Sequence, residues 1–228
     1  MNPQATSGGG GMNPARSEQV RSGAGVGDDL VAAAAGLSAA SLHEAARRAG
    51  ALPAALKPVD PAMRLCGRAL PVRCPAGDNL WIHRALADAD PGEVLVVETG
   101  AGADFGYWGE IMATAAIARG LAGLVITGGV RDSLRLIELG LPTFSAAISI
   151  RGTLKNPAGA GAVGEPVRIG EVVVRRGDLV FGDADGVVVL DPETAAAAVP
   201  AAARRDADEA AILDQVRAGA LTLDVYKL

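Results

Sequence analysis

Short apolar runs alternate with segments of helical periodicity along most of the chain from Asp28 onward. The apolar runs are rich in Val, Leu and Ile, which predicts buried strands, whereas the segments between them repeat apolar residues at helical spacing. The expected strands are 63–74, 93–98 and 123–127, and the expected helices are 38–50, 79–88, 110–120 and 132–139. Strands and helices that alternate in this way form parallel βαβ units, so the pattern predicts an α/β fold.

After residue 140 the pattern changes to short strands separated by glycines. These strands are expected at 143–151, 167–169, 171–174, 179–181 and 187–190. The last long segment, 192–219, follows Asp191 and is rich in alanine, which predicts a helix that is broken or kinked at Pro200. The chain should therefore have a β-rich C-terminal half that ends in a helix.

The first 27 residues lack apolar periodicity and contain a run of four glycines, so 1–27 is expected to be a flexible N-terminal extension. The remaining residues, 28–228, are enough for one hydrophobic core but not for two. We therefore expect a single domain.

The composition of the chain disfavours some classes of binding partner. The chain carries 21 Lys and Arg against 26 Asp and Glu, a net charge of −5, and is 3% aromatic, which disfavours phosphate contacts and base stacking with nucleic acid. It contains no run of about 20 apolar residues and no apolar signal segment, so neither a membrane partner nor export is expected, and we expect a cytoplasmic protein. Cys66 and Cys74 are separated by about 26 Å of extended chain, which predicts free thiols.

Two loops follow neighbouring strands of the predicted parallel sheet. One leads into the helix that begins near Gly109, and the other contains Arg131 and Asp132. Because a βαβ crossover places both loops beyond the carboxyl ends of adjacent strands, we expect them to face one crevice. The free amides of a helix start bind anions, the arginine fork suits a carboxylate, and the aspartate suits a hard cation such as Mg²⁺. An Arg–Asp pair at a strand end is also a common structural ion pair, so the dipeptide alone does not decide between the two roles.

Other chemistries find little support. The loop 99–108 lacks the third glycine of a dinucleotide-binding fingerprint, since position 105 is Phe. The chain has no P-loop lysine motif and no G-x-S-x-G elbow, and its two histidines, His43 and His83, make no zinc-type cluster. Both histidines are expected to be structural, although His83 could protonate a substrate.

Seven short motifs occur together in the order seen in RraA-like proteins. They are Ser41-Leu-His-Glu-Ala45, Pro75-Ala-Gly-Asp-Asn79 with Ile82-His83, Gly106-Tyr-Trp-Gly-Glu-Ile-Met112, Gly128-Gly-Val-Arg-Asp132, Gly152-Thr-Leu-Lys-Asn156, Gly182-Asp-Ala-Asp-Gly-Val-Val188 and Leu221-Thr-Leu-Asp-Val-Tyr226. The resemblance covers about residues 30–228, and within the superfamily the chain most resembles the 4-hydroxy-4-methyl-2-oxoglutarate / 4-carboxy-4-hydroxy-2-oxoadipate aldolases.

The resemblance implies a three-layer α/β fold of the swivelling-domain type, assembled as trimers or hexamers with active sites at subunit interfaces. It also implies metal-dependent (class II) retro-aldol cleavage of a small 2-oxo acid to pyruvate, with oxaloacetate decarboxylation as a side activity. The metal would be Mg²⁺, with Mn²⁺ as the alternative.

Carried over residue by residue, the resemblance gives the segment Gly109, Glu110, Ile111 and Met112 the role of holding the pyruvate moiety on backbone amides. Arg131 matches the substrate-binding arginine, and Asp132 matches the direct metal ligand. Glu110 lies where the aldolases carry an acid beside the metal-bound water. Glu209 matches an acid contributed by the neighbouring subunit, although its place in a charged helical segment would also suit a solvated helix face.

One position departs from the aldolase pattern, because Arg135 stands where these enzymes often carry an acid three residues after the metal aspartate. This change is expected to alter metal hydration or substrate preference. Two alternatives stay open: a non-catalytic regulator that binds a ribonuclease, as RraA itself does, and a dedicated oxaloacetate decarboxylase that uses the same pyruvate enolate.

Overall fold

The computed structural model describes residues 25–228, which fold around one nine-stranded sheet and a small separate hairpin. The helices are α1 Asp28–Ala34, α2 Ala39–Ala45, α3 Leu80–Asp88, α4 Glu110–Ala118, α5 Ser133–Leu139, α6 Pro192–Arg217 and α7 Thr222–Tyr226. The strands are β1 Lys57–Pro58, β2 Leu65–Arg73, β3 Glu93–Glu98, β4 Gly106–Trp108, β5 Gly123–Val130, β6 Thr143–Ile148, β7 Ala162–Val163, β8 Val167–Ile169, β9 Val172–Val174, β10 Leu179–Asp183 and β11 Gly186–Leu190.

The main sheet runs in the order β1-β6-β5-β3-β2-β10-β11. Its central strands β2, β3, β5 and β6 are parallel, and the crossovers between them contain α3, α4 and α5. The hairpin β10–β11 joins β2 antiparallel, and β1 joins β6 antiparallel at the other edge. The predicted α/β class and its parallel βαβ units are therefore confirmed, and the β-rich C-terminal half ends in α6 as expected.

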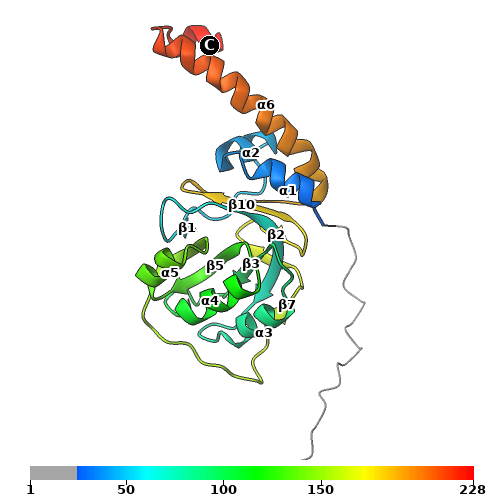
Figure 1. Cartoon of the computed structure of the whole chain (residues 1–228), viewed down its shortest axis with the longest axis vertical. Coiled ribbons are helices and arrows are strands. Elements are labelled where there is room, and N and C mark those ends of the chain that lie inside the picture. Colours follow the sequence, from blue (N-terminus) through cyan, green and yellow to red (C-terminus); the bar gives the residue numbers. More distant parts are fainter. Residues whose placement is uncertain (1–24) are drawn as a thin grey trace, which may run out of the picture.

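Helices cover the sheet on two sides, which gives the three-layer arrangement (Figure 1). One core cluster joins α3, α4 and α5 to the alternate side chains of the parallel strands, such as Leu95 and Ile126. A second joins α1, α2 and α6 to the hairpin β10–β11. A third lies within the curve of the sheet and contains Val96, Val125 and Phe144, which the hairpin β8–β9 helps to cover. The alternation along each strand explains why the central strands are apolar on both faces.

Several elements differ from the sequence-based expectation. Residues 106–108 were expected to lie within a loop, but they form β4, which pairs with β5 in parallel. Residues 1–24 of the expected extension lie outside the described part of the chain. At its end, however, Val26 is buried and donates its amide to the Gly177 carbonyl at 2.9 Å, so the packed chain begins before Asp28.

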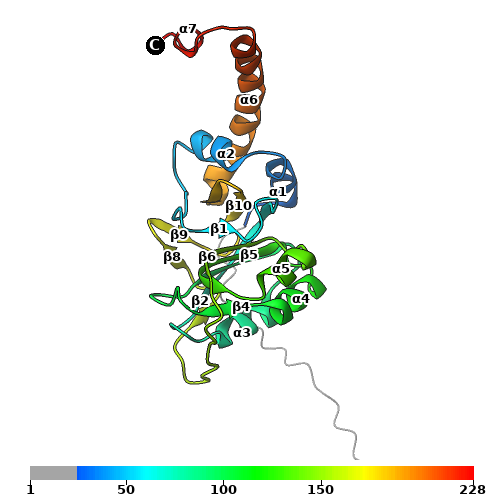
Figure 2. The ribbon, with the colours of Figure 1, turned by 90° about the vertical axis from the view of Figure 1, so that its left-hand side faces the viewer.

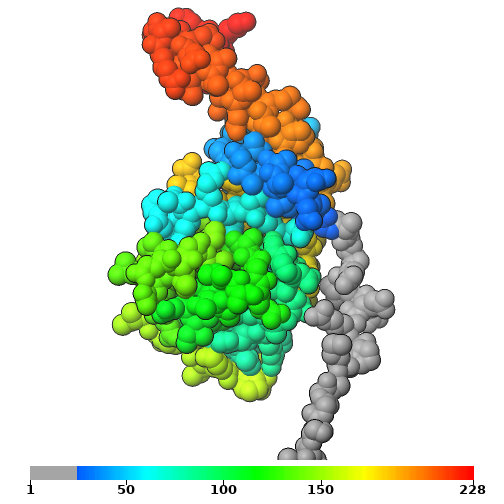
Figure 3. All heavy atoms as spheres, viewed as in Figure 1, coloured from blue at the N-terminus to red at the C-terminus, as the bar shows by residue number. Residues whose placement is uncertain are grey.

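Of the break or kink expected at Pro200, the break is wrong, because α6 is one continuous helix of 26 residues. A proline inside a helix removes one backbone hydrogen bond. Here its neighbours Ala198, Val199 and Ala202 are buried against the body, and this packing holds the helix through the proline. The second half of α6 and the short α7 then extend away from the body as a C-terminal arm, which Figures 2 and 3 show in orange and red. We call residues 203–228 the C-terminal arm.

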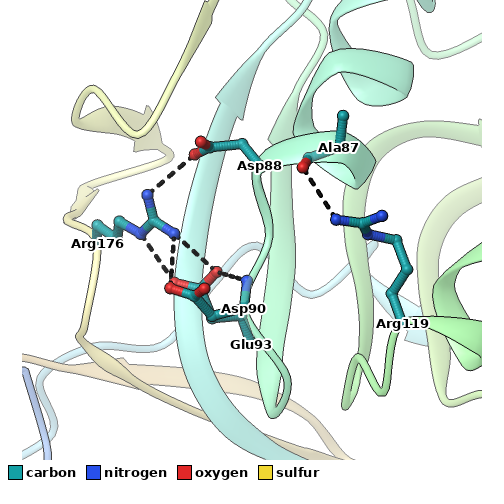
Figure 4. Close-up of polar contacts among 6 residues, drawn as sticks. All are labelled: Ala87, Asp88, Asp90, Glu93, Arg119 and Arg176. Carbon is teal, nitrogen blue, oxygen red and sulfur yellow. Dashed lines mark hydrogen bonds and ion pairs between the residues drawn. The ribbon is translucent and has the colours of Figure 1, made fainter. Parts of the chain in front are cut away.

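An ion-pair cluster fixes the end of the sheet at which β3 begins (Figure 4). The Arg176 guanidinium donates to both carboxylate oxygens of Glu93, from Nε at 2.8 Å and from Nη2 at 3.0 Å, and also contacts Asp88 and Asp90. Burial disfavours the charge of Arg176, but the hydrogen bond and charge of Glu93 and then Asp88 outweigh it, so the pKa of Arg176 is raised. Nearby, Arg119 at the end of α4 donates to the Ala87 carbonyl at 2.9 Å.

Two further expectations bear on the chain as a whole. Both cysteines are free thiols, as predicted. Within residues 25–228, none of the helices has the length and apolar character needed to cross a bilayer.

Candidate active site

The candidate site lies where β4 and β5 end side by side. Trp108 pairs with Val130, and the Arg131 amide donates to the Trp108 carbonyl at 2.8 Å. This pairing brings the start of α4 directly against the residues that follow β5. The two loops that the sequence predicted to face each other therefore lie side by side.

Glycines make this close approach of the strands possible. A Cβ on Gly128 would lie 2.6 Å from the Tyr107 ring, and one on Gly129 would lie 2.9 Å from the Phe105 carbonyl oxygen. From sequence, these two glycines could serve a close ligand or a tight turn. In the structure they admit the segment 105–108 against β5.

Asp132 has an unusual backbone that turns its carboxylate toward α4. Its φ of 56° and ψ of 37° are left-handed, a conformation that aspartate tolerates better than most residues but that is rare outside glycine. Although it is the residue before α5, its side chain does not cap that helix. Instead, Oδ2 accepts the Glu110 amide at 3.1 Å and lies 3.9 Å from the Arg131 Nε. Strained backbone of this kind concentrates at functional sites.

The absence of a side chain at Gly109 also serves this contact. Its φ of −160° is extended and would suit any residue, so conformation does not require glycine here. The available space does require glycine, because a Cβ at position 109 would overlap Asp132 Oδ2 and lie 3.1 Å from the Arg131 Cγ. The Asp132 carboxylate therefore packs against the start of α4 in the space that the missing side chain of Gly109 leaves.

The start of α4 presents unpaired amides. The first residues of a helix have no intrahelical acceptor for their N–H groups. In the described part of the chain, the carbonyls of Tyr107 and Trp108 accept from Asn79 Nδ2 at 2.8 Å and from the Arg131 amide, and neither accepts from Ile111 or Met112. The amides of Ile111 and Met112 are thus available to an anion, next to the positive end of the helix dipole.

Glu110 lies between Asp132 and Arg135. Its amide contacts the Asp132 carboxylate, and its own carboxylate Oε1 is 3.6 Å from the Arg135 Nε. The Arg135 Nη1 donates to Glu138 at 2.5 Å, and the hydrogen bond and charge of Glu138, then the charge of Glu110, raise the pKa of Arg135. The side chains of Glu110, Asp132 and Arg131 are between 43% and 48% exposed, so all three are open to solvent.

The loop 149–156 forms a wall beside the site that the sequence analysis quoted only as part of a motif. The Gly106 amide donates to the Arg151 carbonyl at 2.8 Å, and the Arg151 guanidinium stacks on the Phe105 ring at 4.1 Å. The same loop brings Lys155 near His83, whose pKa is lowered by burial and then by the charge of Lys155. Only the motif Gly152-Thr-Leu-Lys-Asn156 could have pointed to this loop.

Glu209 does not join the other site residues within one chain. It lies on α6, where its Oε1 pairs with the Arg205 Nε at 2.9 Å. That helix packs against α1, α2 and β11 and leaves the body at the end away from α4 and α5 (Figure 1). Along the inner side of α6, Glu209 borders an open hollow of about 480 Å³ together with Ser38 and Arg64.

The residues at the crevice fit a hard divalent cation bound through one direct carboxylate. The described residues contain no group of three or more His, Cys, Asp or Glu side chains placed to hold a metal. Mg²⁺ does not need such a group, because it keeps several waters and is bound by one or two carboxylates. Asp132 offers such a carboxylate, half-exposed and fitted into the space that Gly109 leaves open.

Comparisons with known proteins find relatives for most of the chain. A family model described as RraA-like, Aldolase/RraA, matches residues 28–189. A putative 4-hydroxy-4-methyl-2-oxoglutarate aldolase from Halalkalibacterium halodurans is 32% identical over 171 residues, which are 73% of this chain and 80% of that protein. A protein of the same description from Shewanella oneidensis is 29% identical over 55% of this chain and 74% of its own length.

Solved structures show the same fold. An uncharacterized protein from Pseudomonas syringae pv. tomato superposes with a TM-score of 0.77 at 26% identity, covering 90% of this chain and all of that one. The RNA-processing inhibitor RraA from Thermus thermophilis superposes with a TM-score of 0.60 at 29% identity, covering 67% of this chain and 91% of that one. The relatives thus include both names that suggest catalysis and names that suggest inhibition.

Proposed function

This chain belongs to the Aldolase/RraA family, and from that premise we propose that it is a divalent-metal-dependent retro-aldol lyase. Its substrate would be 4-hydroxy-4-methyl-2-oxoglutarate, 4-carboxy-4-hydroxy-2-oxoadipate or both, each cleaved to pyruvate and a second 2-oxo acid. Oxaloacetate decarboxylation would be a side activity of the same site, because both reactions pass through the enolate of pyruvate.

One observation carries the proposal: the Asp132 carboxylate lies against the start of α4, with Arg131 beside it and the amides of Ile111 and Met112 free. A helix start suited to an anion, a guanidinium and a half-exposed carboxylate thus lie next to one another, which supports the proposal. A 2-oxo acid presents a carboxylate and an adjacent keto oxygen, and these groups match the amides and the Arg131 fork. A surface that serves only to bind a protein has no evident need of this combination.

The cleavage requires a base for one proton and positive charge for one oxygen. The C4 hydroxyl gives its proton to Glu110, or to a water that Glu110 positions, and the C4–O bond becomes a carbonyl as the C3–C4 bond breaks. The electron pair of that bond passes to the pyruvate fragment, whose keto oxygen gains negative charge. Arg131 stabilises this charge, and a proton from water then converts the enolate carbon to the methyl group of pyruvate.

Asp132 is the residue that would hold the metal, and Mg²⁺ or Mn²⁺ bound there would supply further positive charge for the carboxylate and keto oxygens of the substrate. The left-handed backbone of Asp132 and the open space at Gly109 keep its carboxylate facing the crevice. The backbone amide of Glu110 donates to one of the two Asp132 carboxylate oxygens.

We further propose a homo-oligomer, a trimer or hexamer, in which Glu209 of one subunit completes the site of another. Apolar side chains are exposed on two separate surfaces. Ile111, Leu134, Ile148 and Ile150 surround the crevice and are 62–94% exposed, and Leu213, Leu221, Leu223 and Tyr226 on the C-terminal arm are 50–64% exposed. Exposed apolar groups of this extent mark surfaces that a partner covers. Because the arm extends beyond its own body, it is the segment that can bring Glu209 to a second copy.

The first test measures pyruvate release from the two 4-hydroxy-2-oxo acids and from oxaloacetate, each with Mg²⁺ and with EDTA. Release from a hydroxy acid that EDTA abolishes is the expected result. Release from oxaloacetate alone would replace the aldolase by a decarboxylase, and no release from any of the three would favour a non-catalytic binding protein.

Substitutions at the crevice test the assigned roles. Asp132→Ala should abolish the metal-dependent turnover, and Arg131→Ala should lower kcat by about 10²–10³-fold, the usual effect of losing one oxyanion donor. The exposed residues Asp29 and Arg168 offer matched controls, since Asp29→Ala and Arg168→Ala remove the same side chains far from the crevice. Wild-type turnover in Asp132→Ala or Arg131→Ala would refute the site.

Glu209 requires a test across subunits. Glu209→Ala and Asp132→Ala protomers, each inactive alone, should recover part of the activity when they are co-expressed with different tags and purified as mixed oligomers. A mixed oligomer contains sites in which an intact Glu209 meets an intact Asp132 only if the two residues come from different chains. Full activity of Glu209→Ala alone, or no recovery in verified mixed oligomers, would refute this role.

A further inference from the structure

Arg135 places a second guanidinium at the rim of the candidate site. It follows Asp132 by three residues, so it stands one helical turn above the aspartate at the start of α5. Its Nε lies 3.6 Å from the Glu110 carboxylate, and that glutamate contacts Asp132 through its amide. Arg131 and Arg135 therefore lie on either side of the Asp132–Glu110 pair.

The side chain of Arg135 is held in place and still open to a ligand. Glu138, one turn further along α5, accepts from Nη1 at 2.5 Å and fixes the direction of the guanidinium. In the described part of the chain, hydrogen bonds engage Nη1 but not Nη2. The Arg135 side chain is 60% exposed, more than Glu110 or Asp132. An arginine fork has five N–H donors, so donors remain for a carboxylate that approaches from solvent.

We propose that Arg135 is a specificity-determining residue that binds the carboxylate a substrate carries beyond C4, so that the site favours a 4-carboxymethyl over a 4-methyl 4-hydroxy-2-oxo acid. The inference rests on the proposed aldolase function. The two substrates share their C1 carboxylate, their keto group and the carboxylate and hydroxyl on C4. They differ in one substituent, which is a methyl in one and a carboxymethyl in the other.

The charges around the rim give the direction of the preference. With the pyruvate end of the substrate on the α4 amides and Arg131, the C4 substituents extend outward past Glu110. There an added carboxylate meets the repulsion of Glu110 unless a cation stands next to it, and Arg135 is that cation. A methyl group gains nothing from Arg135, because it carries no charge and accepts no hydrogen bond.

The experiment compares kcat/KM for 4-carboxy-4-hydroxy-2-oxoadipate and 4-hydroxy-4-methyl-2-oxoglutarate in wild type, Arg135→Gln and Arg135→Lys. Arg135→Gln should lower kcat/KM for the carboxymethyl substrate by about tenfold, the effect of one partly exposed charge-assisted hydrogen bond, and should change the methyl substrate by less than about twofold. Arg135→Lys keeps the positive charge but lacks the arginine fork, so its kcat/KM for the carboxymethyl substrate should lie between those of wild type and Arg135→Gln. Arg168→Gln, an exposed arginine on the separate β8–β9 hairpin, should leave both values unchanged.

The ratio of the two kcat/KM values separates this role from a structural one. A loss that is equal for both substrates would show that Arg135 acts through Glu110 or through folding, and would overturn the inference while leaving the aldolase in place. An unchanged ratio in Arg135→Gln would overturn it in the same way. Absence of pyruvate release by the wild-type enzyme from both hydroxy acids would overturn the aldolase itself and, with it, the role given to Arg135.

Discussion

Replacement of Arg176 by Met should destabilise the fold by about 2–3 kcal/mol. The Glu93 carboxylate is 7% exposed and receives two of its hydrogen bonds from this guanidinium, at 2.8 and 3.0 Å. Without Arg176, the Asp90 amide, at 2.9 Å, is the one donor to it that remains among residues 25–228. Removing one partner of a fully buried ion pair costs about 3–5 kcal/mol, and we take a smaller value because the Arg176 side chain is 30% exposed. The ion pairs of Arg176 with the exposed Asp88 and Asp90 add little to this loss of stability.

Urea unfolding of wild type, Arg176→Met, Glu93→Gln and the double variant, all at one protein concentration, measures this pair as a double-mutant cycle. We expect a coupling of about 2 kcal/mol and a fall in Tm of roughly 5–10 °C for Arg176→Met. Arg217→Met is the matched control, because Arg217 pairs with Asp214 on the surface and both side chains are at least 70% exposed. If Arg176→Met lowers the free energy of unfolding by no more than this control does, under about 0.5 kcal/mol, the reasoning is refuted.

Three further predictions follow from local geometry. Gly109→Ala should fold normally but lose about 10²-fold in turnover, because the new methyl displaces the Asp132 carboxylate; unchanged kcat would contradict this. Burial raises the pKa of Cys66 to about 11 and of Cys74 to about 12, so alkylation of the native protein at pH 8 should be far slower than after unfolding, and equal rates would contradict it. Asp191→Ala should lose about 1 kcal/mol at pH 7 in urea unfolding. Because a backbone amide and then a hydroxyl in the first turn of α6 lower the pKa of Asp191, this difference should shrink as the pH falls through 3.8 and be lost below the lowered pKa of the native state, and a difference that did not shrink with falling pH would contradict it.

The sequence by itself determined the fold class, because the signals involved are local. Apolar runs such as 93–98 and 123–127 are too short for helices and too apolar for exposed strands, and the segments between them repeat at helical spacing. The adjacency of the two loops also followed from the sequence, since parallel strands joined by right-handed crossovers bring successive loops to the same edge of the sheet. The juxtaposition of Gly109 with Arg131 and Asp132 needed no knowledge of side-chain packing.

Where sequence reasoning failed, the cause was usually a contact between distant segments. Residues 106–108 contain too few apolar positions to signal a strand, and they become one only because the glycines of β5 leave space for Tyr107. Pro200 predicts a break on local grounds, but burial of Val199 and Ala202 against the body keeps α6 continuous. In both cases long-range packing outweighs a local preference.

Only the tertiary structure decided how the site residues relate to one another. The left-handed backbone of Asp132, the hydrogen bond from the Glu110 amide and the proximity of Arg135 to Glu110 are not encoded in spacing along the chain. The structure also separates Glu209 from the crevice by directing α6 away from α4 and α5, which composition could not indicate. The physical reason is the same throughout: periodicity reports which face of an element is buried, whereas the distance between two polar side chains depends on how those elements pack.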